Sequence, residues 1–388
     1  MEQNRITRLI RARIDKTAEG EHSSPLFLTS SFCFDSSEDM RAAFADETDA
    51  NIYSRFSNPN SQELVDRMCI LEGTEDGFAT ASGMSAIFST FMALMKQGDH
   101  LLVCNAIFGS THTVITKFLP KFGIEYTYVP ADKPEAWEHA IRPNTKMIFL
   151  ETPTNPGLDI IDLEVVNSIA KKHGIILVVD NCFATPLGQR PIDFGADIII
   201  HSATKWLDGQ GRTLGGVVLG KSELVYDIYL FCRSTGPALS PFNAWILSRS
   251  LETLEVRMQR HVENAFYLSQ KLEGHDKIEW LKYPFLASHP QYAVAKKQMK
   301  DGGGLFCFEL KEGLEGGRRF LDRLQLLSLT ANLGDTRTIA SHPASTTHAK
   351  LSKEERLAVG ITPGMIRISA GLENSDDILN DILQALDE

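Results

Sequence analysis

Between residues 57 and 220, the spacing of hydrophobic positions changes repeatedly from that of helices to that of strands. In segment 82–95, apolar side chains recur at positions 84, 87, 88, 91, 94 and 95, which is typical of one face of a helix. The pattern predicts further helices over 111–122 and 163–173. Short apolar runs predict strands at 100–104, 125–129, 146–151, 175–179, 196–200 and 216–219. Buried strands that alternate with helices indicate an α/β protein with a mainly parallel central sheet covered on both faces.

The flanking segments have different patterns. Residues 1–56 contain turns and short apolar pieces without a long periodic segment, and they predict an extended arm whose basic start packs on the protein. A long helical stretch is expected at 241–272, followed by a mixture of helices and strands such as 305–310. A chain of 388 residues is too long for one simple core. We therefore expect an N-terminal arm over 1–56, a large domain over 57–250 and a smaller α+β domain over 251–388.

Composition and charge narrow the class of protein. The chain is 43% hydrophobic and 23% charged, which is typical of a soluble globular enzyme. Its net charge of -11 argues against a nucleic-acid partner, because an acidic surface repels phosphate backbones. No apolar run reaches the ~18 residues that a membrane span requires. The histidine spacing matches no zinc site, so no metal is expected.

Cysteine usage and the basic N-terminus bear on the compartment. The six cysteines are dispersed, without a C-x-x-C pair, and most lie in apolar surroundings, which suits reduced thiols in a cytoplasmic protein. Four arginines in the first 16 residues raise the alternative of a targeting peptide. Glu2 and Asp15 interrupt that pattern and no secretory apolar region follows, so a cytoplasmic protein acting on a small molecule is expected.

The strongest chemical signal is a lysine just beyond a predicted strand. Lys205 follows the apolar run 196–200, with Ser202 and Thr204 before it and a glycine-rich loop after it. Ligands of open α/β sheets bind beyond the carboxyl ends of the strands. A partly desolvated lysine there has a lowered pKa and can form a Schiff base with an aldehyde. A lone lysine is more often a solvated surface residue, so this signal needs support.

Two further signals support it. Asp180 ends the preceding strand, so a carboxylate and an amine would face the same crevice. Pyridoxal phosphate needs that pair, since the amine holds its aldehyde carbon and the carboxylate keeps its ring nitrogen protonated. Residues 81–85, with sequence ASGMS, begin the helix over 82–95 and offer backbone N–H groups to a phosphate. Taken singly, Asp180 and this turn would be ordinary helix caps.

These residues belong to a series of longer motifs. The motifs are YSRFSNP at 53–59, ASGMSA at 81–86, ETPTNP at 151–156, VVDNCFATP at 178–186, HSATK at 201–205, SPFNAW at 240–245, SHPASTTH at 341–348 and IRISAGLE at 366–373. In these motifs the chain resembles, over nearly its whole length, the Cys/Met-metabolism pyridoxal-phosphate enzymes, the cystathionine γ-synthase-like group. The resemblance implies a fold type I transferase of the aspartate aminotransferase-like kind, with pyridoxal 5'-phosphate as cofactor.

The resemblance also implies roles for the residues that would hold the cofactor. Lys205 would be the Schiff-base lysine and the proton shuttle, and Asp180 would pair with the pyridine nitrogen. Backbone N–H groups and hydroxyls would bind the phosphate. These groups belong to Gly83, Met84, Ser202 and Thr204.

Other matching residues would complete the site. Tyr53 and Arg55 would reach the phosphate of the neighbouring subunit, so the site would need a dimer, and two dimers would form a homotetramer. Asn155 would lie beside the cofactor and help to hold the substrate, together with Asn332. Arg367 would bind the substrate α-carboxylate through its planar guanidinium.

One departure from the family pattern points to the reaction. Many members carry tyrosine where this chain has Phe108, whose ring can stack on the cofactor but cannot donate a proton. A thiolate leaving group benefits from a proton because a thiol has a pKa of about 8.5, whereas a carboxylic acid has a pKa of about 4. Phe108 therefore favours a substrate that expels a carboxylate. The stretches DGQGR at 208–212 and ANLGDT at 331–336 are most similar to the O-succinylhomoserine sulfhydrylase branch.

The expected reaction is γ-replacement on O-succinyl-L-homoserine or O-acetyl-L-homoserine, in which hydrosulfide enters and L-homocysteine is released for methionine biosynthesis. Cystathionine γ-synthase, with cysteine as nucleophile, is an alternative, and methionine or cystathionine γ-lyase is another. A cofactor-binding regulator is the non-enzymatic alternative. It is disfavoured because Lys205, Asp180 and Arg367 are all present.

Overall fold

A seven-stranded sheet forms the centre of the protein in this computed structural model, which describes residues 3–131, 133–346, 349, 352–358 and 360–387. Its strand order is β1-β7-β6-β5-β4-β2-β3. The strands are β1 Asp76–Thr80, β2 His100–Cys104, β3 Glu125–Val129, β4 Thr145–Glu151, β5 Ile176–Asp180, β6 Ile198–Ser202 and β7 Gly216–Gly220. The neighbouring strands β6, β5, β4, β2 and β3 are parallel to one another, whereas β7 is antiparallel to both of its neighbours, β1 and β6. The expected α/β class with a mainly parallel sheet is confirmed.

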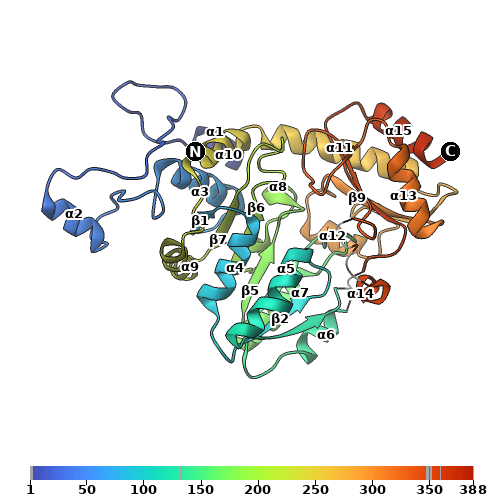
Figure 1. The fold of residues 1–388 in the computed structure, drawn as a ribbon, viewed down its shortest axis with the longest axis horizontal. Helices are drawn as coiled ribbons and strands as arrows, with labels where there is room; N and C mark the ends of the chain where they lie inside the picture. Colours follow the sequence, from blue (N-terminus) through green and yellow to red (C-terminus); the bar gives the residue numbers. More distant parts are fainter. Residues whose placement is uncertain (1–2, 132, 347–348, 350–351, 359, 388) are drawn as a thin grey trace.

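Helices cover both faces of this sheet, as Figure 1 shows. They are α3 Pro59–Glu72, α4 Gly83–Leu94, α5 Gly109–Thr113, α6 Pro134–His139, α7 Leu163–His173, α8 Thr185–Gly188, α9 Ser222–Thr235 and α10 Pro241–Leu251. Strand β7 shows why both faces are apolar: Val217 packs in one core with Leu64 of α3, and Val218 packs in the other with Phe91 of α4. Such a strand is hydrophobic at every position and not at alternate positions.

The elements predicted for the large sheet and its helices are found, with some differences. The helix expected over 111–122 is divided into α5, a π-helical turn η1 Val114–Phe118 and a 3-10 turn η2 Leu119–Phe122. Strand β1 was not predicted, because its sequence DGFAT is short and includes a glycine, which weakens the strand signal. A further 3-10 turn, η3 Pro191–Phe194, precedes β6.

A second sheet of five strands forms the core of the C-terminal part, at the right of Figure 1. Its order is β10-β11-β12-β9-β8, with β8 Ile278–Lys282, β9 Leu305–Leu310, β10 Ser328–Leu329, β11 Ile339–Ser341 and β12 Met365–Ser369. The helices of this part are α11 Leu254–Leu272, α12 Tyr292–Gln298, α13 Gly313–Arg323, α14 Lys353–Ala358 and α15 Ser375–Asp387. The helix expected over 241–272 is thus two helices, α10 and α11. The domain boundary at 250/251 stays a prediction, and Leu247, Leu254 and Leu305 share one core across it.

The N-terminal arm is fixed at its root and extends away from the rest of the protein (Figure 1). Helix α1 Arg5–Arg11 packs through Leu9, which is buried. Ser24 then donates a hydrogen bond of 2.6 Å to Glu63 and accepts one of 2.9 Å from the Trp245 indole. Beyond this anchor the arm carries the short helix α2 Ser37–Phe44.

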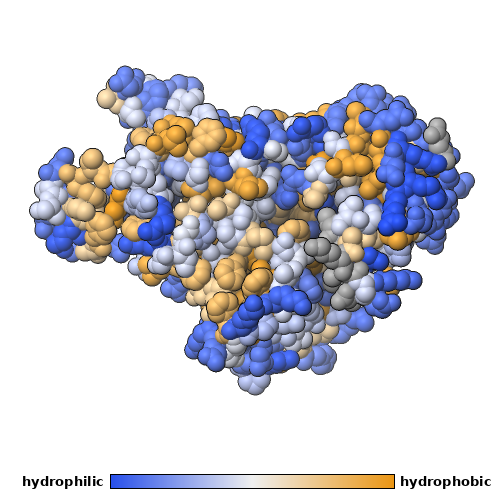
Figure 2. Space-filling model, in the orientation of Figure 1, coloured by the Kyte–Doolittle hydropathy of each residue, from blue (hydrophilic) through white to orange (hydrophobic). Residues whose placement is uncertain are grey.

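Apolar side chains gather on the extended part of the arm, as the surface in Figure 2 shows. Leu28 is 70% exposed and Phe44 is 49% exposed. Among the helices that the structure describes, none combines the length and the apolar character that a membrane crossing requires.

Candidate active site

Three neighbouring parallel strands end in polar residues at the same edge of the large sheet. Strand β4 ends at Glu151, β5 at Asp180 and β6 at Ser202. Glu151 and Asp180 are register partners, and Asp180 pairs with Ile200 of β6. Lys205 follows three residues after the end of β6. The topology therefore brings a carboxyl pair and an amine to the edge where open α/β sheets bind their ligands.

The Lys205 amine lies in a mostly buried environment. Its Nζ donates a hydrogen bond of 2.5 Å to Oδ1 of Asn332. Burial lowers the pKa of Lys205, and the positive charge of Arg367 lowers it further, whereas Cys182 and Asp180 oppose the shift. A lowered pKa increases the fraction of neutral amine, which is the form that attacks an aldehyde.

The Asp180 carboxyl is half-buried at the end of β5 and has polar neighbours. Its Oδ1 accepts a 2.9 Å hydrogen bond from the backbone N–H of Cys182. Burial raises the pKa of Asp180, while this hydrogen bond and the charges of His201 and Lys205 oppose the rise. His201 is itself held by Glu72, with 2.6 Å between Nε2 and Oε1. A carboxylate at this position is suited to keep a ring nitrogen protonated. The attraction between the carboxylate and the protonated nitrogen is stronger when both are shielded from water.

The start of α4 meets the end of β6 in a very close contact. A Cβ atom added to Gly83 would lie 2.7 Å from the Cβ of Ser202, so glycine is what allows the approach. Ser82 caps the helix by accepting a 3.1 Å hydrogen bond from the backbone of Ser85. The backbone N–H groups of Gly83 and Met84 lie in the first turn, where no helical carbonyl can accept them. The result is a helix N-terminus beside a serine hydroxyl, an arrangement that binds phosphate.

Thr204 is placed near the same loop but its hydroxyl is already engaged. It donates to the carbonyl of Gly215 at 3.3 Å and accepts from the Gly215 N–H at 3.1 Å. Its predicted contact with a phosphate would require the hydroxyl to exchange one of these partners.

Arg367, on β12, faces the same edge from the C-terminal sheet. Its guanidinium donates to Oδ1 of Asn155 at 2.9 Å and to the carbonyl of Asn332 at 3.3 Å. Its Nε is buried without a hydrogen-bond partner among the described residues, and no carboxylate in the described part of the chain forms an ion pair with it. Burial lowers the pKa of Arg367 to about 10. A buried guanidinium with an unused N–H group is suited to a ligand carboxylate.

Phe108 lies at the border of the site, as the residue that precedes α5. Its backbone N–H donates a 2.8 Å hydrogen bond to Oε1 of Glu151. The residue is 42% exposed. The ring is therefore available to a bound molecule.

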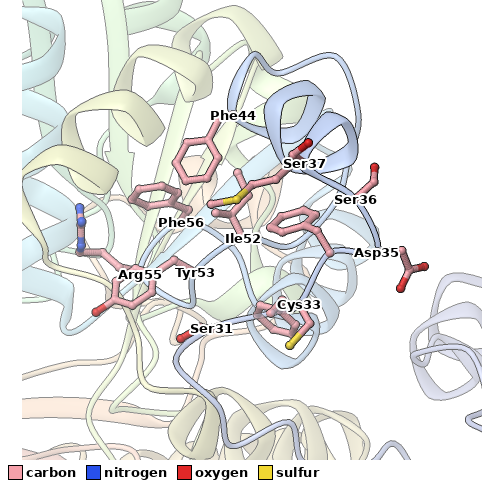
Figure 3. A pocket seen from close by; sticks show the side chains of 13 residues that line it. Ser31, Cys33, Asp35, Ser36, Ser37, Phe44, Ile52, Tyr53, Arg55 and Phe56 are labelled. Atoms are coloured by element: carbon pink, nitrogen blue, oxygen red, sulfur yellow. The ribbon is translucent and has the colours of Figure 1, made fainter.

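Tyr53 and Arg55 lie elsewhere, on the N-terminal arm. The Arg55 guanidinium donates to the carbonyl of Arg233 and lies 4.8 Å from the centre of the Phe56 ring. Figure 3 shows Tyr53 and Arg55 among the residues that line a cavity of about 810 Å³, together with Phe44 and Phe56. No hydrogen bond or ring contact among the described residues joins Tyr53 or Arg55 to Lys205. Their role in a neighbouring subunit stays a prediction.

Sequence reasoning missed several polar residues of the site. Glu151 and Cys182 lie inside the motifs ETPTNP and VVDNCFATP, but neither was singled out. The signal for Glu151 is the one that identified Asp180, namely a carboxylate at the end of an apolar strand. Residues 347 and 348 of the motif SHPASTTH lie outside the described residues. In the described part of the chain, no group of three or more His, Cys, Asp or Glu residues could hold a metal ion.

The chain is similar in sequence to one family of known enzymes over nearly its whole length. The family model of the Cys/Met metabolism PLP-dependent enzymes matches residues 6–387. An O-succinylhomoserine sulfhydrylase of Pseudomonas aeruginosa is 45% identical over 380 residues, which cover 98% of this chain and 94% of the relative. An L-methionine gamma-lyase of Porphyromonas gingivalis is 41% identical, with coverage of 98% and 96%.

Solved structures agree with these relatives in fold. A crystal structure from Campylobacter jejuni, provisionally assigned as an O-acetylhomoserine (thiol)-lyase, superposes with a TM-score of 0.96 and 36% identity over the full length of both chains. That chain carries N'-pyridoxyl-lysine-5'-monophosphate at its position 205. Cystathionine gamma synthase from Xanthomonas oryzae pv. oryzae, in complex with aminoacrylate and cysteine, has a TM-score of 0.94 and 34% identity, with coverage of 100% and 98%.

Proposed function

The chain belongs to the Cys/Met metabolism family of PLP-dependent enzymes, and from this premise we propose that it replaces the γ-succinyloxy group of O-succinyl-L-homoserine with a thiol group. Hydrosulfide is the incoming nucleophile, and the products are L-homocysteine and succinate. O-acetyl-L-homoserine is the related donor, with acetate as the second product. The reaction exchanges one γ-substituent for another, so it needs no oxidant or reductant. Its product would enter methionine biosynthesis.

The residues at the sheet edge fit the cofactor of this family. Lys205 would hold its aldehyde carbon, the Asp180 carboxylate would keep its ring nitrogen protonated, and the start of α4 would bind its phosphate through Gly83, Met84 and Ser202. When bound, pyridoxal phosphate supplies an electron sink for the charge left at the substrate α-carbon. The fit is supported by the place of the Asp180 carboxyl at the end of β5 and by the close approach of Gly83 to Ser202.

Separate groups of the site would hold the substrate and deprotonate it. Arg367 would bind the substrate α-carboxylate, with Asn155 and Asn332 holding its guanidinium in place. The Nζ of Lys205 would accept the proton from the substrate α-carbon and return a proton later. The lowered pKa of Lys205 favours this role, because a general base must be neutral near the working pH.

The observation that carries the proposal is the absence of a hydroxyl on Phe108. Its exposed ring borders the site, where it can stack on a bound ring but cannot protonate a leaving group. Succinate leaves readily as an anion, since the pKa of its acid is about 4. A thiol leaving group, with a pKa of about 8.5, would leave poorly without a proton donor.

Methionine γ-lyase activity is the second candidate, and the 41% identity to such an enzyme favours it. It requires methanethiol to leave from the γ-carbon, which is the step that Phe108 does not assist. Cystathionine γ-synthase activity differs only in the nucleophile, which would be cysteine.

The arm supports an assembly in which subunits share their sites. Tyr53 is 39% exposed, and apolar residues of the arm such as Leu28 are exposed as well. We propose that Tyr53 and Arg55 reach the cofactor phosphate of a neighbouring subunit, in a dimer that pairs into a tetramer. A cytoplasmic location is part of this proposal.

The test is product identification by mass spectrometry. The purified holoenzyme is given O-succinyl- and O-acetyl-L-homoserine, with hydrosulfide and cysteine in competition, and separately L-methionine. Homocysteine as the main product is expected, and the faster donor identifies the acyl group. Cystathionine as the main product would instead assign the enzyme as a γ-synthase, and rapid formation of 2-oxobutyrate from methionine would contradict the argument from Phe108.

A further inference from the structure

Glu151 is a buried carboxyl at the centre of the site to which the proposed reaction gives no role. It is the last residue of β4, it is 5% exposed, and it is the register partner of Asp180 on the adjacent parallel strand. Side chains of register partners in a parallel sheet point to the same face. Two carboxyl groups therefore lie side by side at the edge where the cofactor ring would bind.

One oxygen of Glu151 binds the backbone just before helix α5, which precedes β4 in the sequence. It accepts a 2.8 Å hydrogen bond from the backbone N–H of Phe108, the residue immediately before α5. No side chain caps this helix from Phe108 itself. The position of the Phe108 ring therefore depends on a contact between the end of β4 and the start of α5.

Two carboxyl groups at adjacent strand ends, one of them buried, oppose each other's ionisation, because like charges in a low-dielectric site repel strongly. Burial raises the pKa of Glu151 well above its usual range, and the negative charge of Asp180 raises it further. The groups that face the pair from other elements act differently on the two acids. Lys205 and His201 favour the charged form of Asp180, whereas the Phe108 N–H is the group that favours the charged form of Glu151. The thiol of Cys182 also faces the pair.

We propose that Glu151 is a positioning residue that works as a neutral carboxylic acid: it fixes the backbone of Phe108, and so the ring, while the negative charge of the carboxyl pair stays on Asp180. A second negative charge at this edge would compete for the proton of the cofactor ring nitrogen. The neutral acid keeps its carbonyl oxygen as a hydrogen-bond acceptor. This inference rests on the proposed placement of the cofactor, and it does not depend on which nucleophile or acyl group the enzyme uses.

The test compares two substitutions in the purified protein. Glu151→Gln is neutral and retains a side-chain oxygen acceptor, whereas Glu151→Ala removes the acceptor of the Phe108 N–H. Glu135→Gln, at an exposed position on α6, is the matched control. The apo forms are titrated with pyridoxal phosphate, and the affinity is measured by the change in protein fluorescence.

Glu151→Gln is expected to bind pyridoxal phosphate within about twofold of the parent, and Glu151→Ala about tenfold more weakly, which corresponds to ~1.4 kcal/mol for an unsatisfied N–H group. Equal weakening in the two variants would overturn the proposal, because it would show that the ionised carboxylate is required. Because the readout is cofactor affinity, it is separate from the product analysis that tests the proposed function.

A direct measurement of protonation covers the case in which Glu151→Ala does not fold. Infrared difference spectroscopy of the apo protein near neutral pH should show the C=O stretching band of a protonated carboxylic acid. The band should be lost in Glu151→Gln and retained in the control. A spectrum in which Glu151→Gln loses no such band would show that Glu151 is ionised, and the proposal would be wrong.

Discussion

The side-chain amine of Lys205 and the side-chain oxygen of Asn332 lie 2.5 Å apart, although 127 residues separate them in the sequence. The main-chain oxygen of Asn332 also accepts from Arg367 at 3.3 Å. Asn332 therefore joins the amine to the guanidinium. Its loop is held closely against the lysine: Gly334, with φ of +75°, would place an added Cβ 2.7 Å from the backbone nitrogen of Trp206. Both the left-handed conformation and the close approach require glycine there.

The first prediction concerns this contact. Asn332→Ala should lower kcat about tenfold, because a proton-transferring amine loses the acceptor that orients it. In Asn332→Asp a nearby carboxylate stabilises the protonated amine and raises the pKa of Lys205. The increase of the rate with rising pH should therefore occur at higher pH than in the parent. An unchanged pH profile in Asn332→Asp would show that Asn332 does not act on Lys205 during turnover.

The second prediction concerns the specificity argument. Phe108→Tyr places a hydroxyl where the ring borders the site, and a positioned acid contributes about 10²-fold or more to protonation of a leaving group. The rate of 2-oxobutyrate formation from L-methionine should therefore rise at least about tenfold. The control is Phe108→Leu, which removes the ring without adding a proton donor and should not raise this rate. Equal rates in the tyrosine and leucine variants would remove the basis for excluding lyase activity.

The third prediction concerns the start of α4. Gly83→Ala adds a Cβ that would lie 2.7 Å from the Cβ of Ser202, so the helix terminus and the strand end must separate. Affinity for pyridoxal phosphate should fall about tenfold or more, because phosphate binding needs the helix N–H groups and the hydroxyl at fixed positions. Gly157→Ala, where an added Cβ meets Asp159 at an ordinary 3.4 Å, is the control. Normal cofactor affinity in Gly83→Ala would argue against the phosphate site.

Much of this fold follows from local patterns in the sequence. The runs that became β2, β4, β5 and β6 are buried on both faces, so their continuous hydrophobicity identified them without reference to distant residues. The same runs located Asp180 and Lys205, because parallel strands end at one edge of a sheet. The fold class was therefore predictable from the sequence.

Other parts depend on contacts that a linear sequence does not reveal. The carboxyl of Glu151 is informative only once β4 and β5 are known to be neighbours in register with Asp180. The pairing of Asn332 with Lys205 joins the second sheet region to the first, and the resemblance named Asn332 without naming this contact. Tyr53 and Arg55 were assigned to the cofactor by resemblance, yet a single chain keeps them on the arm with Arg233.

The residue after Lys205 is also tied to the C-terminal part, through a histidine that must stay neutral. The ring of Trp206 lies 4.8 Å from the ring of His261 on α11, in an edge-on contact. Nδ1 of His261 lies 2.6 Å from the carbonyl of Ala370, just beyond β12, and Nε2 is buried without a partner among the described residues. Burial lowers the pKa of His261 to about 4.

The fourth prediction follows from the sign of this shift. The folded-state pKa of His261 lies below the unfolded value of about 6.5, so its contribution to stability is complete above that pH and is lost as the pH falls toward 4. Thermal unfolding of the apo protein should show Tm falling between pH 6.5 and pH 4. His261→Gln keeps a side-chain N–H but does not titrate, so its Tm should be lower near pH 7 and should fall less between pH 6.5 and pH 4. The control is His139→Gln, at an exposed position, which should behave like the parent. Because His261 packs against Trp206, cofactor affinity should decline over the same range. An acid-induced loss of Tm as steep in His261→Gln as in the parent would assign the effect to other buried histidines, such as His100, whose pKa burial also lowers to about 4.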